Sequence, residues 1–111
     1  MSLNYRVEIR IPSIDRHGRR IESAKRRREV DATARFFVSH YGGAEIAEVR
    51  GLWNGEGDKV VVENVSIVSS YADEGKVCPW TMRMLAQRIA KQLDQETVAL
   101  VLGDEMQFVS P

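Results

Sequence analysis

Residues 44–71 constrain the fold more than any other part of the sequence, because they have the pattern of two long β-strands joined by a turn. Both sides of the turn at residues 54–58 are rich in Val, Ile, Leu, Trp and Tyr. The turn sequence Asn-Gly-Glu-Gly-Asp supplies residues that adopt positive φ angles easily, as a hairpin loop requires. A hairpin of this length is not stable alone in water, so other elements must cover one of its faces.

The segment before the hairpin predicts a strand and then a helix. Residues 5–11 alternate between apolar and charged side chains up to Pro12, which is the pattern of a half-buried strand. From about Ala24 the apolar spacing becomes helical, and Gly42-Gly43 is a pair suited to ending the helix. The apolar stripe of this helix consists of Val30, Ala34, Phe37 and Tyr41.

The segment after the hairpin predicts a second helix and a terminal pair of strands. Pro79 suits the first helical turn, and the helical stripe that follows is the cleanest in the chain. A short apolar strand is predicted at residues 97–102, and a turn at Gly103-Asp104 leads into residues 105–109 as an edge strand. The stripe of the second helix consists of Met82, Leu85, Ala86, Ile89, Ala90 and Leu93.

The predicted order β-α-β-β-α-β indicates an α+β fold. Two right-handed crossovers around a central hairpin give a four-stranded antiparallel sheet with both helices on one face, the ferredoxin-like sandwich. We expect one such domain over residues 1–111, with an extra C-terminal edge strand as a possible addition.

The opposite face of this sheet should lack a cover. It is expected to carry Arg6, Glu8 and Arg10 from the first strand and an apolar mixture from the hairpin. In the hairpin, Gly51 suggests a bulge or a close backbone approach, and a second bulge is expected near residues 63–64. The apolar mixture is drawn from Ile46, Leu52, Val60, Val62 and Val68.

An apolar sheet face of this size predicts a covering partner. One possibility is that the C-terminal segment folds over part of it. The favoured alternative is a second copy of the chain, because closed homodimers are the commonest soluble assembly.

Composition narrows the class of protein. The formal net charge is zero, so no field of the whole molecule draws the chain to nucleic acid or membrane. Cys78 is the single cysteine, which excludes an internal disulfide and fits a reducing cytosol. The sequence has no apolar run long enough to span a bilayer and no signal-peptide core, so a cytoplasmic protein is expected.

Residues 16–28 contain a basic cluster that contrasts with the neutral whole. A cluster of this kind can neutralise the phosphates of RNA or DNA. The favoured interpretation is a solvated helix face, because no aromatic side chains for base stacking are interleaved with the cations. The candidate anion-binding residues are Arg16, Arg19, Arg20, Lys25, Arg26, Arg27 and Arg28.

A second candidate site depends on convergence in space. If His40 at the end of the first helix met Glu63 between Trp53 and Tyr71, the pair could act as acid and base in an aromatic pocket. The favoured interpretation is that His40 complements the helix dipole and that Trp53 belongs to the core. Cys78 is expected to be a buried or half-buried thiol rather than a nucleophile, and no metal or other cofactor is expected.

Several short segments together resemble a pattern found in short bacterial proteins of unknown function. In these proteins a helix ends in a glycine pair, a G-x-W hairpin follows, and a Q-E-x-V strand comes later. The resemblance implies the same ferredoxin-like architecture and carries no catalytic residues with it. The matching segments here are residues 11–18, 41–44, 51–53 and 94–98.

These observations predict a small domain that self-associates through its sheet and binds a small ligand or a protein partner. The first alternative is a nucleic-acid-binding module that uses residues 16–28. The second alternative is a small enzyme with a pocket near His40 and Glu63. The architecture alone cannot choose among them, because it hosts many functions.

Overall fold

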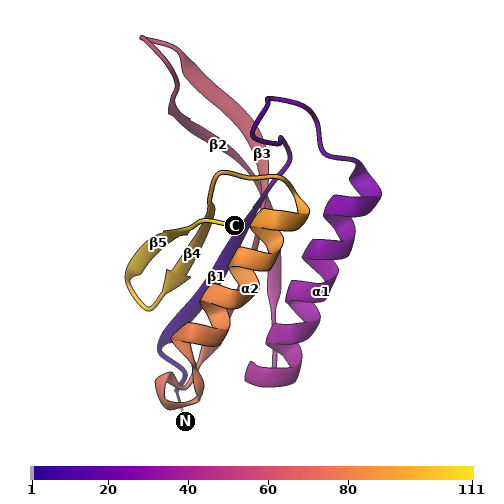
Figure 1. Ribbon diagram of the computed structural model, residues 1–111. Helices are drawn as coiled ribbons and strands as arrows, with labels where there is room; N and C mark the ends of the chain where they lie inside the picture. The colour runs from indigo at the N-terminus through magenta and orange to yellow at the C-terminus, as the bar shows by residue number, and fades with distance from the viewer. Residues whose placement is uncertain (1) are drawn as a thin grey trace.

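The computed structural model describes residues 2–111 as a five-stranded antiparallel sheet with both helices on one face (Figure 1). This confirms the predicted ferredoxin-like α+β architecture, including the additional C-terminal strand. The elements in chain order are β1 (Tyr5–Pro12), α1 (Ser23–Tyr41), β2 (Glu45–Asn54), β3 (Val60–Ala72), a short 3-10 turn (Glu74–Lys76), α2 (Pro79–Gln92), β4 (Val98–Leu102) and β5 (Glu105–Val109).

Strand β1 lies at the centre of the sheet. The strand order is β2-β3-β1-β4-β5, and every neighbouring pair is antiparallel. The crossover through α1 leads from β1 to β2 at the edge, and the hairpin returns β3 to the side of β1. The crossover through α2 then places β4 on the other side of β1, as the ferredoxin-like order requires.

The helices begin and end where the sequence predicts. Gly42 has a φ of 90°, and its N–H donates to the carbonyl of Val38, so glycine closes α1 in a left-handed conformation. Pro79 occupies the first turn of α2, where its missing N–H leaves no hydrogen bond unmade. No helix within residues 2–111 is both long enough and apolar enough to cross a membrane.

The core lies between the helices and one face of the sheet. Strand β1 buries Val7, Ile9 and Ile11 completely, and the side chains between them point to the other face. Phe37 of α1 and Met82 of α2 are also fully buried, so both helices contribute to this single core.

The hairpin pairs without interruption from Glu45 opposite Ser69 to Asn54 opposite Val60. The two predicted bulges are therefore wrong. The predicted close backbone approach at Gly51 is not found either, because the atoms with which a Cβ atom here would clash belong to the Trp53 ring. Gly51 lets that indole fold back over its own strand.

The predicted assignment of hairpin residues to the uncovered face is also wrong. Val68 is fully buried opposite Ile9, and Ile46, Leu52, Val60 and Val62 alternate in register with it, on the helix side of the sheet. Those four are nevertheless exposed, and Figure 1 shows the tip of the hairpin extending past both helices. Because side chains alternate along a strand, an error of one residue in register exchanges the two faces.

The uncovered face, hereafter the open face, carries the other half of each strand. Arg6, Glu8 and Arg10 lie on it as predicted, since they alternate with the buried residues of β1. The hairpin side chains on this face are Glu45, Ala47, Val49, Trp53, Val61, Glu63, Val65, Ile67, Ser69 and Tyr71, and those of β4 and β5 are Ala99, Val101, Met106 and Phe108. Trp53 is 45% exposed, so its predicted place in the core is wrong.

Substitution of two phenylalanines tests which face of the sheet is covered and which is open. Phe37 is fully buried, whereas Phe108 on the open face is 68% exposed. We expect Phe37→Ala to lower the free energy of unfolding by about 3–5 kcal/mol, because it leaves a cavity in the core. Phe108→Ala should change it by about 0.5 kcal/mol or less in dilute protein. Urea denaturation followed by circular dichroism measures both, and equal losses would contradict the assignment of faces.

Candidate functional site: a hollow on the open face

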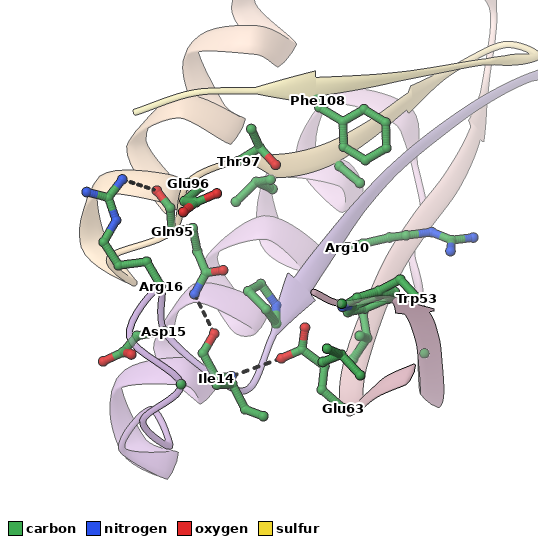
Figure 2. A pocket seen from close by; sticks show the side chains of 18 of the residues that line it. Arg10, Ile14, Asp15, Arg16, Trp53, Glu63, Gln95, Glu96, Thr97 and Phe108 are labelled. Atoms are coloured by element: carbon green, nitrogen blue, oxygen red, sulfur yellow. Dashed lines mark hydrogen bonds between the residues drawn. The ribbon is translucent and has the colours of Figure 1, made fainter. Parts of the chain in front are cut away.

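A hollow of about 820 Å³ lies on the open face where β1 ends and β4 begins (Figure 2). Its lining comes from the strands, from the loops that leave β1 and enter β4, and from the turn between β2 and β3. The strands contribute Arg10, Pro12, Val49, Gly51, Trp53, Val61, Glu63, Val65, Val98, Ala99, Met106 and Phe108, and the loops contribute Ile14, Asp15, Arg16, Gly18, Gly55, Glu56, Gln95, Glu96 and Thr97.

Two loops form one wall of the hollow, because hydrogen bonds join them. The Nε2 atom of Gln95 donates to the carbonyl of Ile14 at 2.7 Å, and this side chain is only 9% exposed. The backbone N–H of Arg16 donates to the carbonyl of Asp94 at 2.8 Å. Asp94 has a φ of 50°, a left-handed conformation that Asp tolerates better than most residues. The loop after β1 is thereby fixed to the loop before β4.

Glu63 is a half-buried carboxylate in this hollow. Its Oε2 atom accepts a hydrogen bond from the backbone N–H of Ile14 at 3.1 Å, which Figure 2 shows as a dashed line. Burial raises the pKa of Glu63, and hydrogen bonds from the backbone of Ser13 and Ile14 offset only part of that rise. A carboxyl with a raised pKa can take up or hold a proton closer to neutral pH than an ordinary Glu.

Aromatic side chains stand on two sides of the hollow. The Trp53 ring lies over Gly51, the residue paired with Glu63 across the hairpin. Phe108 extends from β5 beside Thr97, away from Trp53 in Figure 2. Both rings are exposed to solvent, so each has surface free to stack against a flat ligand.

A chain of charged side chains continues from the hollow along β1. Glu8 is only 3% exposed, although no backbone element covers this face. Its two carboxylate oxygens accept hydrogen bonds from Arg6 at 2.7 Å and from Arg10 at 2.8 Å. Burial opposes ionisation of Glu8, but the two guanidinium groups outweigh it, and the pKa of this carboxyl is lowered.

The structure brings together only part of the predicted acid–base site. Trp53 and Glu63 line the hollow, but His40 and Tyr71 do not. The Nδ1 atom of His40 lies 2.9 Å from the carbonyl of Phe36, and its ring stacks on Phe36 with the centroids 3.9 Å apart. Tyr71 is eight residues along β3 from Glu63, roughly 26 Å at ~3.3 Å per residue. The less favoured alternative, in which His40 meets Glu63, is therefore not what the structure shows.

The basic cluster is divided among several partners. Arg16 lies 3.6 Å from Asp94 and lines the hollow, and Arg19 pairs with Asp15 at 3.3 Å. Arg26 is held by the hydroxyl of Ser66 and the carbonyl of Pro12. The remaining four residues, Arg20, Lys25, Arg27 and Arg28, lie before or in the first turns of α1. Nucleic-acid binding by this cluster stays a prediction.

The expectation that Cys78 is buried or half-buried is wrong. Its thiol is exposed, because Cys78 is the residue that precedes the first turn of α2. Hydrogen bonds from Thr81 lower the pKa of this thiol. Cys78 lies outside the hollow.

Other residues of the site were not identified from the sequence. Gln95 belongs to the Q-E-x-V segment, but nothing in the sequence predicts its hydrogen bond to Ile14, because that bond forms only where two loops meet. Arg10 was expected on the open face, but its place beside a hollow follows only from the arrangement of the neighbouring strands. The alternation of β1 was the one available signal.

Comparison with known proteins gives a structural match alone. No protein-family model and no curated protein matches the chain. A phage SAM lyase in complex with S-methyl-5′-thioadenosine has a TM-score of 0.67 and 14% identity, over 100% of this chain and 93% of that chain. A phage SAM lyase in the apo state has a TM-score of 0.64 and 15% identity, over 98% and 90% of the two chains. The TM-scores show a shared fold, and at these low identities the likeness extends to the fold alone.

The raised pKa of Glu63 gives a pH-dependent prediction. A carboxyl whose pKa is raised by folding stabilises the protein fully below its unfolded pKa, about 4.3, and this stabilisation is lost as the pH rises through the folded pKa. We therefore expect Glu63→Gln to raise the melting temperature relative to wild type at pH 7 but not at pH 4. Melting curves at intervals between these values measure the difference. Glu45→Gln on the same face is the control, and a difference independent of pH would contradict the prediction.

Proposed function

We propose that the hollow binds a small adenosine thioether or sulfonium ligand, the class that contains S-methyl-5′-thioadenosine and S-adenosylmethionine (SAM). The observation that carries this proposal is a half-buried carboxylate, Glu63, beside an indole with a free face, Trp53. The shared fold with SAM lyases supports the choice of ligand class.

The chemistry of the lining suits the parts of such a ligand. A purine ring stacks favourably on an aromatic side chain, and Trp53 offers the larger ring system, with 45% of the residue exposed. Carboxylates such as Glu63 accept hydrogen bonds from ribose hydroxyls and attract a sulfonium cation. Val49, Val65 and Ala99 provide apolar contacts for a methylthio group. The volume of about 820 Å³ lies in the usual range for small-molecule sites.

A more specific form of this proposal is that the protein is an enzyme that acts on SAM. In this form Glu63 takes a proton from the carbon next to the one bonded to sulfur in the amino-acid chain of SAM, a role that its raised pKa suits. The bond between that chain and sulfur breaks with its electron pair left on sulfur, so the chain leaves as an unsaturated amino acid and the other product is S-methyl-5′-thioadenosine. Incubation with SAM followed by chromatography detects that product, and Glu63→Gln identifies the contribution of the carboxylate.

Binding is tested by calorimetry with S-methyl-5′-thioadenosine. We expect Trp53→Ala to weaken binding about tenfold or more, because stacking on an aromatic side chain contributes about 1–3 kcal/mol. Trp80→Ala is the matched control, since Trp80 is 65% exposed on α2 and outside the hollow, and it should leave affinity unchanged. An absence of binding at millimolar ligand would reject the proposal, as would equal losses in the two variants.

We also propose that the chain self-associates through the open face. The support is the apolar surface that surrounds the hollow, where Val49, Trp53, Val61, Met106 and Phe108 are all between 37% and 68% exposed. Sedimentation velocity at micromolar protein should show a homodimer, and Phe108→Glu should shift it to monomer because it places a charge in the apolar contact. A wild-type protein that sediments only as monomer would end this proposal.

We place this ligand-binding activity in the cytoplasm. The support is the single exposed Cys78, which has no partner in the chain for a disulfide. Nucleic-acid binding is the less favoured proposal, because Arg16, Arg19 and Arg26 of the cluster contact protein groups.

A further inference from the structure

Arg10 connects the hollow to the charged side chains of β1. It lines the hollow, and its Nε atom donates to Oε2 of Glu8 at 2.8 Å. Among residues 2–111, no hydrogen-bond partner is found for its two terminal nitrogens, and the side chain is 40% exposed. The guanidinium is therefore held at its Nε edge, and its terminal nitrogens are available to a ligand. Figure 2 shows the Arg10 side chain at the level between Trp53 and Phe108.

Glu8 fixes the position of this guanidinium, but it does not neutralise the ion cluster formed by Arg6, Glu8 and Arg10. The carboxylate is buried between Arg6 and Arg10, so the three side chains together carry one positive charge. Arg6 is further occupied by the hydroxyl of Tyr71 at 3.2 Å. Of the two arginines beside Glu8, only Arg10 lines the hollow, so the N–H groups available to a ligand there are those of Arg10.

The carboxylates that line the hollow determine which ligand charges it attracts. Asp15, Glu56, Glu63 and Glu96 surround it on the loops and the hairpin, and Asp15 is paired with Arg19. A purely anionic ligand would be repelled by this lining. A zwitterion fits better, because its ammonium can face the carboxylates while its carboxylate reaches the guanidinium of Arg10.

We propose that Arg10 binds the carboxylate of an amino-acid tail, so that the hollow prefers adenosine thioethers that carry such a tail over S-methyl-5′-thioadenosine. This inference rests on the proposed function. A homocysteine tail reaches about 5 Å from its sulfur to its carboxylate, given C–C bonds near 1.5 Å. Such a tail extends from the adenosine end of the hollow along β1.

Two ligands with the same neutral sulfur separate the contributions. S-adenosylhomocysteine carries the amino-acid tail, and S-methyl-5′-thioadenosine has a methyl group in its place. We expect calorimetry to show that wild-type protein binds S-adenosylhomocysteine about tenfold more tightly, the value of one charge-assisted hydrogen bond. Arg10→Met keeps most of the apolar stem, and it should remove this preference, so that the variant binds the two ligands with about equal affinity.

A matched variant and a third ligand complete the experiment. Arg50→Met removes an exposed arginine from the other face of the sheet, so the preference should remain about tenfold. The carboxamide of S-adenosylhomocysteine retains the ammonium but lacks the negative charge, and wild-type protein should bind it about as weakly as S-methyl-5′-thioadenosine. This comparison needs no variant and tests the inference even if Arg10→Met fails to fold.

The outcomes separate the two proposals. If neither ligand binds wild-type protein, the proposed function fails and this inference fails with it. If both ligands bind equally, or if the carboxamide binds as tightly as the acid, the role of Arg10 is overturned while the ligand class stands. If Arg10→Met weakens both ligands by the same factor, Arg10 supports the shape of the hollow and does not recognise the tail.

Discussion

The structure depends on the alternation of side chains along the central strand. Val7, Ile9 and Ile11 face the helices and are fully buried, whereas Arg6, Glu8 and Arg10 face the other way. A central strand with two apolar faces would need cover on both. Here the second face is satisfied by an ion cluster, in which two guanidinium groups enclose one carboxylate. The helices can therefore occupy a single side of the sheet, and the other side is left free for a ligand.

The position of the hollow follows from how the chain leaves and re-enters this sheet. The loop after β1 and the loop before β4 meet at the same end, where Gln95 and Asp94 bond to the backbone of the first loop. The tip of the hairpin extends past both helices (Figure 1). The hairpin supplies Trp53 and Glu63 to the hollow. Three segments distant in sequence thus enclose the site. None of them would form such a site alone.

Periodicity predicted the elements correctly, but it did not determine which face of the hairpin is covered. The helical stripes, Gly42 and Pro79 are local signals, and local conformation is enough to explain them. The hairpin is apolar on both sides, so only its pairing with β1 decides that Val68 is buried and Val65 faces the open side. The same uncertainty placed Trp53 in the core. Glu63 was identified as a candidate by residue type, whereas its bond to Ile14 required knowledge of a loop conformation.

The separation of His40 from Glu63 has a consequence for the chemistry available to the hollow. His40 contacts its own helix, and the hollow contains no histidine in its lining, so its proton-transferring groups are carboxyls. Glu63 and Glu8 have opposite environments within one sheet face. Burial with only backbone donors raises the pKa of Glu63, whereas two guanidinium groups lower that of Glu8. One carboxyl is thereby suited to exchange a proton and the other to remain charged and hold Arg10. A ligand lying between them would meet a group that titrates at one end and a fixed cation at the other.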